Sequence, residues 1–145
     1  MSTLRLPATL CGIVIGLSGM TACARPTDSA QAAARTFVDR FFVELDQRGA
    51  LALTEGVAHA KVEEEVRLLG DEPPSTRDER PRVYYRQLAA DTQDDGMAFR
   101  FRLTVVVVGD APVEPEVMIR VRQRGGEWRV SNYEVLPPRA APPAA

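Results

Sequence analysis

Hydrophobic residues recur at two different spacings along the chain, and the first of them is helical. Between residues 34 and 45 apolar residues return every three or four positions while charged residues take the other face, which is typical of an amphipathic helix. The apolar positions are Ala34, Phe37, Val38, Phe41, Phe42 and Leu45. We expect this helix to start at an N-cap, Asp28, and to end near Gly49. Shorter periodic segments predict two further helices over 50–54 and 57–69.

After Pro81 the spacing changes from helical to alternating, which predicts β-strands. We expect four of them, over 82–91, 97–108, 113–124 and 127–136, separated by the turn signals Asp94-Asp95-Gly96, 109–112 and Gly125-Gly126. Their inward residues are Phe99, Phe101, Leu103, Val105, Val107, Val117, Ile119, Val121, Trp128 and Val130. Three helices followed by four antiparallel strands, with a helix laid across one face of the sheet, predict an α+β fold.

The N-terminal apolar run, residues 10–23, has the character of a secretory signal peptide. It follows a short lead that contains Arg5, and it is too short for a membrane-spanning helix, which needs about 20 apolar residues. Its last four residues, Met20-Thr21-Ala22-Cys23, resemble a bacterial lipobox. The resemblance implies that the Cys23 thiol carries lipid and that Cys23 becomes the new N-terminus. The alternative is ordinary signal-peptide cleavage after Ala22.

The lipobox reading predicts a domain organisation and a location. Residues 1–22 form the signal peptide, 23–28 a lipidated tether, 29–136 one folded domain, and 137–145 a disordered tail rich in proline and alanine. Residue 24 is alanine, whereas aspartate at this place favours the inner membrane in Gram-negative lipoproteins. We therefore expect an outer-membrane protein of the cell envelope that faces the periplasm.

Composition narrows the classes of partner and cofactor. The chain has a formal net charge of −2, so it gives no indication of nucleic-acid binding. Its two cysteines, Cys11 and Cys23, leave none in the folded domain for a disulfide bond. The consecutive carboxylates Glu63, Glu64 and Glu65 point in different directions on a helix and do not converge as cation ligands do. We expect no metal site and no cofactor.

Two short segments, together with the order of elements, resemble the NTF2-like, cystatin-like superfamily. The first is 37–53, two helices separated by Asp46-Gln47-Arg48-Gly49, and the second is the closing Gly126-Glu127-Trp128-Arg129-Val130. The resemblance spans 29–136. It implies a sheet curved around the long helix, often with an apolar pocket, and in many members a homodimer formed through the sheets. Members include isomerases, dehydratases, ligand or partner binders, and exported lipoproteins of unassigned role.

The resemblance implies that a pocket would be lined by residues such as Phe41, His59 and Trp128, although a phenylalanine stripe is also what a helix buries in an ordinary core. Enzymes of the superfamily place a general base in the pocket, and the chain offers His59 or Asp46. The tyrosines Tyr84, Tyr85 and Tyr133 are the candidate hydrogen-bond donors. No second ionisable group stands at a recognisable spacing, so we assign no catalytic residue.

Arginines gather on the outward face of the predicted sheet. They are Arg100, Arg102, Arg120, Arg122 and Arg129. The Gly-Gly turn sets Arg122 opposite Arg129, and the parity of the neighbouring hairpin allows Arg102 opposite Arg120 and Arg100 opposite Arg122. One interpretation is a solvated face relieved by Glu114, Glu116 and Glu127. The other is a contact surface for phosphate or carboxylate groups of lipid headgroups, envelope polymers or an acidic partner.

Taken together, the sequence predicts a lipid-anchored envelope lipoprotein that acts as a non-catalytic binding or assembly module. One alternative is a pocketed binder of an apolar small molecule. The other is an enzyme of the isomerase or dehydratase type.

Overall fold

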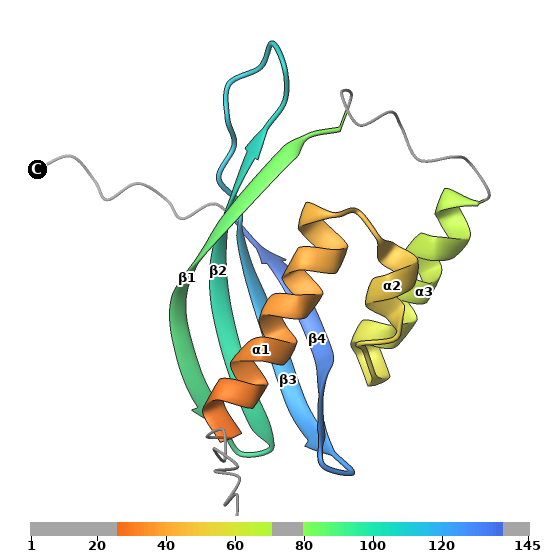
Figure 1. The fold of residues 1–145 in the computed structure, drawn as a ribbon, viewed down its shortest axis with the longest axis vertical. Coiled ribbons are helices and arrows are strands. Elements are labelled where there is room, and N and C mark those ends of the chain that lie inside the picture. The colour runs from red at the N-terminus through yellow and green to blue at the C-terminus, as the bar shows by residue number, and fades with distance from the viewer. Residues whose placement is uncertain (1–25, 71–79, 138–145) are drawn as a thin grey trace, which may run out of the picture.

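The computed structural model describes residues 26–70 and 80–137, so the signal peptide, Cys23 and the tail from residue 138 lie outside the described residues. Three α-helices and a π-helical segment precede a four-stranded sheet (Figure 1). The helical elements are α1 (Pro26–Val38), η1 (Asp39–Val43), α2 (Gln47–Leu51) and α3 (Gly56–Leu69). The strands are β1 (Arg82–Gln93), β2 (Gly96–Val106), β3 (Glu116–Arg124) and β4 (Glu127–Leu136).

The first helix begins earlier and ends earlier than the sequence predicted. Helix α1 starts at Pro26, because proline is well tolerated in the first turn, so residues 26–28 are helical and not a tether. The helix widens into the π-helical η1, which ends at Val43, shortly before Leu45 with its φ of 55°. Asp46 then caps α2 by accepting a 2.8 Å hydrogen bond from the backbone N–H of Gly49. The second helix therefore lies over 47–51 and not over 50–54.

The antiparallel sheet has the strand order β1-β2-β3-β4, so each strand pairs with its neighbour in sequence. All four predicted strands are present, with ends that move by three residues or fewer. The strand β4 continues the sheet into the segment before α3. Val130 donates its N–H to the carbonyl of Leu53, and Glu55 donates its N–H to the carbonyl of Val130. The β4 edge of the sheet is therefore paired with residues 53–55 at Val130.

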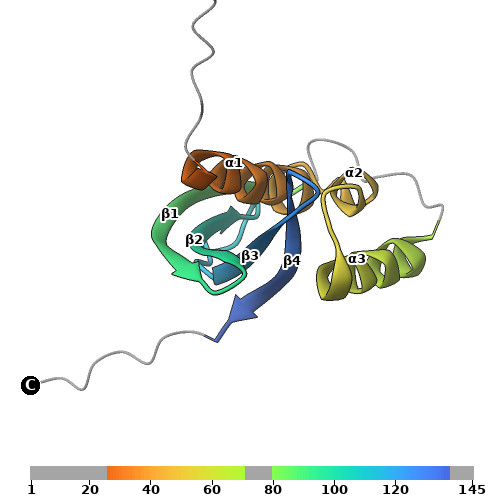
Figure 2. The same cartoon turned by 90° about the horizontal axis from the view of Figure 1, so that it is seen from below.

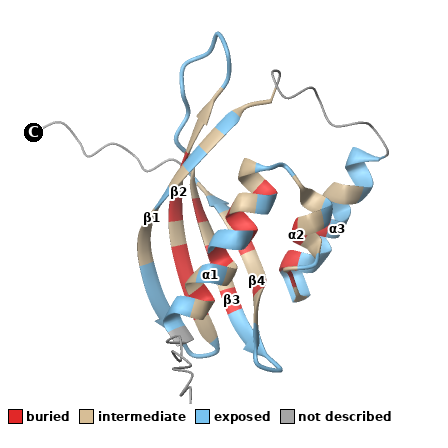
Figure 3. Cartoon of the chain, viewed as in Figure 1, coloured by how far each residue is buried: buried red, intermediate tan, exposed pale blue. Residues whose placement is uncertain are grey.

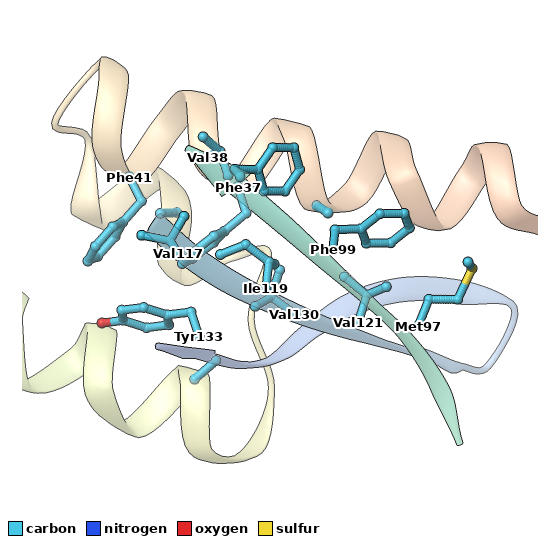
Figure 4. Packing of buried hydrophobic residues seen from close by; sticks show 14 of the residues in the cluster. Phe37, Val38, Phe41, Met97, Phe99, Val117, Ile119, Val121, Val130 and Tyr133 are labelled. Carbon is cyan, nitrogen blue, oxygen red and sulfur yellow. The ribbon is translucent and has the colours of Figure 1, made fainter. Parts of the chain in front are cut away.

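The sheet curves around α1, which lies across its concave face (Figure 2). Buried residues line this face and the facing side of α1, whereas the turns are exposed (Figure 3). Phe37, Phe99, Phe101 and Ile119 are among the largest fully buried side chains. Phe37, Phe99 and Ile119 lie between the helix and the sheet (Figure 4). The predicted inward residue Val107 is instead 42% exposed because β2 ends at Val106. Across residues 26–70 and 80–137, no helix has both the length and the apolar character needed to cross a membrane.

Candidate functional site

Four aromatic rings meet where η1 packs against β4. Phe37, Phe41, Phe42 and Tyr133 lie with ring centroids 4.8 to 6.4 Å apart. The three phenylalanines come from the stripe of α1 and η1. Figure 4 shows Tyr133 projecting from β4 toward Phe41. Phe37 is fully buried, and Phe41 and Tyr133 are nearly so. These rings form a packed part of the core, as the ordinary-core interpretation of the phenylalanine stripe predicted.

Tyr133 carries the most perturbed ionisable group near this aromatic cluster. Its hydroxyl donates a 2.9 Å hydrogen bond to Oε1 of Glu65 on α3. Burial, followed by this bond to a carboxylate, raises the pKa of Tyr133 well above its ordinary value, so the phenol stays protonated at neutral pH. Lys61 Nζ lies 5.2 Å from the ring centroid and donates to the Tyr133 carbonyl at 2.9 Å. The side chain of Tyr133 thus contacts the phenylalanine rings, Glu65 and Lys61.

Two surface grooves flank these helices. One, of about 780 Å³, runs between α3 and β4 and is lined by Val57, Ala60, Lys61, Glu64, Glu65, Tyr133, Glu134 and Val135. The other, of about 800 Å³, lies between the end of η1 and the start of β1 and is lined by Val43, Glu44, Arg80, Pro81, Arg82, Val83 and Tyr84. Both are open to solvent along exposed side chains such as Val57 and Tyr84.

The three predicted pocket residues do not come together. Phe41 packs against Tyr133, whereas Trp128 lies five residues earlier on β4, about 16 Å along the strand. His59 is exposed on α3. Neither groove is lined by Phe41, His59 or Trp128. Phe41, His59 and Trp128 therefore share neither of these two grooves.

His59 contacts a buried threonine. Its Nδ1 lies 3.2 Å from the hydroxyl oxygen of Thr54, which itself donates to the carbonyl of Leu51 at 2.7 Å. The hydroxyl hydrogen of Thr54 is thereby used, so the ring nitrogen of His59 is the donor in this contact. This arrangement fixes the turn between α2 and α3. The other candidate base, Asp46, caps α2 and pairs with Arg40 at 3.2 Å.

The outer face of the sheet carries the arginines, in a register that differs from the prediction. Arg122 lies opposite Arg129, as expected. However, Arg102 lies opposite Glu116 and Arg100 opposite Met118, so the predicted pairs of Arg102 with Arg120 and of Arg100 with Arg122 are wrong. The β2–β3 connection is longer than predicted, and the pairing register of β3 against β2 differs from the predicted one by four residues. In the observed register the cross-strand neighbours of Arg102 and Arg100 are a carboxylate and a methionine, and not two further arginines.

Four of the five predicted arginines have a carboxylate partner. Arg102 binds Glu116 at 2.6 Å, and this bond raises the pKa of the guanidinium further. Arg120 binds Glu134 at 2.7 Å, and Arg129 binds Glu127 at 2.9 Å. Arg122 binds Asp95 in the β1–β2 turn. The solvated-face interpretation expected Glu114, Glu116 and Glu127 to offset the arginine charges. Two of these three carboxylates, Glu116 and Glu127, form ion pairs with the predicted arginines.

Arg100 differs from the other four. It makes no ion pair within the described part of the chain, and its Nε is buried without a hydrogen-bond partner there. The neighbouring strand adds two exposed arginines that sequence reasoning did not assign to the face. Arg86 lies directly opposite Arg102, and Arg82 lies opposite Val106. The alternation of Arg82, Tyr84 and Arg86 with the apolar Val83 and Tyr85 was the available signal.

Comparison with known proteins adds one finding. No family model matches the chain, and no curated protein matches it. Among solved structures, a variant of the designed protein Rd1NTF2_05 matches with a TM-score of 0.54, covering 74% of this chain and 96% of that one. The fold is NTF2-like. At 9% sequence identity the likeness concerns the NTF2-like fold alone, in agreement with the three helices and the open antiparallel sheet.

Proposed function

We propose that this NTF2-like domain is a lipid-anchored, non-catalytic binding module of the bacterial envelope, attached through Cys23 to the outer membrane and facing the periplasm. Its contact surface is the β1–β2 half of the outer sheet face. The observation that carries the proposal is the set of three outward arginines, Arg82, Arg86 and Arg100, for which residues 26–70 and 80–137 supply no carboxylate. Arginine's planar fork suits the carboxylate or phosphate groups of an anionic envelope partner.

The ionisable groups near the core favour binding over catalysis. The Tyr133 phenol is occupied by Glu65, and His59 is turned to Thr54 at the surface. A general base needs a titrating group within hydrogen-bond reach of a bound substrate. Neither groove combines such a group with a closed apolar cavity of the kind that buries a small molecule.

The test has one arm for the anchor and one for the contact surface. Cys23→Ser should move the protein from the membrane fraction to the soluble fraction, because attachment then lacks its acyl chains. In the same soluble form, Arg100→Glu should weaken binding to vesicles containing anionic lipid or to envelope extract, measured by co-sedimentation at low salt. Arg124→Glu is the matched control, since Arg124 lies at the exposed far end of β3.

Each arm can fail on its own. Membrane fractionation of Cys23→Ser that equals the wild type would refute the lipid anchor. Equal binding by wild type and Arg100→Glu would refute the contact surface. Native mass spectrometry of the protein from its own envelope adds a third readout, because a retained apolar molecule would replace the proposal with a pocketed ligand binder.

A further inference from the structure

The two edges of the sheet differ in their backbone hydrogen bonding. Beside β4, residues 53–55 pair with both backbone groups of Val130. Beside β1, the described chain supplies no further strand, although β1 runs for twelve residues. A long uncovered edge strand exposes a row of unpaired N–H and C=O groups that can pair with another chain. The free edge of β1 is therefore a candidate interaction surface.

The register identifies which backbone groups face the free edge. Val105 exchanges backbone hydrogen bonds with Val113, so its N–H and C=O point toward the β3 side of β2. Because these groups alternate along a strand, those of Thr104 and Val106 point toward β1. Val83 lies opposite Val105 and Tyr85 opposite Leu103, whose N–H likewise goes to the β3 side. The N–H and C=O of Val83 and Tyr85 therefore point away from the sheet.

Charged and aromatic side chains flank these free backbone groups. Arg82, Tyr84 and Arg86 alternate along the outer side of β1, and Tyr84 is 59% exposed. Neither arginine has an ion-pair partner in the ranges that the structure describes. The 800 Å³ groove adjoins the same edge, and Arg82 and Tyr84 line it together with Val43, Glu44 and Val83. An extended segment placed here would meet the two arginines and the partly apolar groove that Arg82 and Tyr84 help to line.

Charge decides between two possible occupants of the edge. Antiparallel pairing of two copies of β1 centred on Tyr84 would set Arg82 of one copy opposite Arg86 of the other, at both ends of the contact. Like charges directly opposite each other destabilise a strand pair. An acidic strand in the same place would instead form charge-assisted hydrogen bonds with both arginines. The edge therefore favours an acidic partner over a second copy.

We propose that the β1 edge binds an extended acidic segment of a partner protein as a fifth strand of the sheet. Acidic residues four positions apart would face Arg82 and Arg86, and the residue midway would pack on Tyr84. Backbone bonds to Val83 and Tyr85 would supply affinity, as in other cases of strand addition. This inference rests on the proposed binding function and names its partner class.

The experiment measures binding of labelled synthetic peptides to the purified protein in mild detergent by fluorescence anisotropy. The probe is a nine-residue peptide with glutamates four positions apart, a valine midway and threonines elsewhere. One comparison peptide carries lysine in place of glutamate, and another has N-methylated backbone amides. We expect the glutamate peptide alone to bind, and the double variant Arg82→Glu, Arg86→Glu to weaken it at least tenfold. Arg124→Glu is the control, and circular dichroism checks that each variant folds.

Amide hydrogen exchange separates strand addition from simple charge attraction. The bound glutamate peptide should slow exchange at Val83 and Tyr85 and leave Thr104, which already faces β1, unchanged. Equal binding of the N-methylated peptide would overturn strand addition. A concentration-dependent dimer that protects the same two amides without peptide would overturn the acidic partner in favour of a second copy. If no peptide binds while Arg100→Glu still weakens vesicle binding, this inference fails and the proposed function stands.

Discussion

Tyr133 connects the core to the surface through a single hydroxyl. Its ring packs in the aromatic cluster while its hydroxyl reaches Glu65 on α3, so it links β4 to the helix that covers it. The hydroxyl group of a buried tyrosine usually needs a hydrogen-bond partner, and here the partner is a carboxylate. Replacing this side chain therefore tests how much the hydrogen bond between β4 and α3 contributes to stability.

We predict that Tyr133→Phe lowers the free energy of unfolding by about 1 kcal/mol at neutral pH, the usual net value of such a hydrogen bond. The pH dependence has a definite sign. Above the ordinary tyrosine pKa of 10.0 the unfolded chain loses the phenol proton, whereas the folded chain, whose Tyr133 pKa is raised, keeps it. Stability therefore falls as the pH rises above 10, and the variant should fall less.

Urea denaturation at neutral and alkaline pH measures both effects. Tyr84→Phe is the control, because Tyr84 is 59% exposed on the outer face and its replacement should leave stability at neutral pH unchanged. Equal stability of wild type and Tyr133→Phe would show that the bond to Glu65 contributes nothing net.

At the scale of elements, the turn between β1 and β2 depends on close approach to β3. Gly96 begins β2, and a Cβ at this position would lie 2.0 Å from the backbone carbonyl oxygen of Val121. Because that oxygen belongs to the neighbouring strand, the clash can be relieved only by moving backbone. We predict that Gly96→Ala costs about 1–3 kcal/mol, as overpacking does. Thermal unfolding measures this, with exposed Asp94→Ala as the control, and an unchanged melting temperature would contradict it.

Strands were easier to predict than their register. Alternation constrains only which face a residue takes, and a shift by any even number of residues leaves the inward set unchanged. This is why Phe99, Phe101 and Ile119 were placed inward correctly, while Arg102 was paired with Arg120 and not with Glu116. The Gly125-Gly126 turn has only two residues, so the β3–β4 register beside it followed directly.

The helical part shows the same limit. Apolar residues three and four apart predicted the buried face that runs along α1 and η1, and Phe37 and Phe41 lie on it. The same spacing fits an α-helix and a π-helix, so nothing in the pattern indicated that the turn widens at η1. The candidate pocket was the hardest part to predict. The positions of Phe41, His59 and Trp128 relative to one another depend on packing and not on sequence spacing.

At the scale of the molecule, the proposed anchor would fix which end faces the membrane. Cys23 lies three positions before Pro26 in the sequence, a span of at most about 11 Å. Helix α1 starts at the end of the molecule that holds the β1–β2 and β3–β4 turns, whereas the β2–β3 connection lies at the opposite end (Figure 1). A lipidated Cys23 would therefore keep the two short turns near the headgroups and point the exposed Val108 away from them.

We predict that a fluorescent label on Asp94→Cys, in lipidated protein bound to vesicles, is quenched by spin-labelled headgroups, while the same label on Val108→Cys is not. Both positions are exposed, so labelling leaves the core intact. In this orientation the β1 edge runs from the periplasmic end down toward the membrane, and a partner strand could enter from above without displacing lipid. Equal quenching at the two sites would mean that the domain tumbles freely on its tether, and the edge would then have no fixed direction of approach.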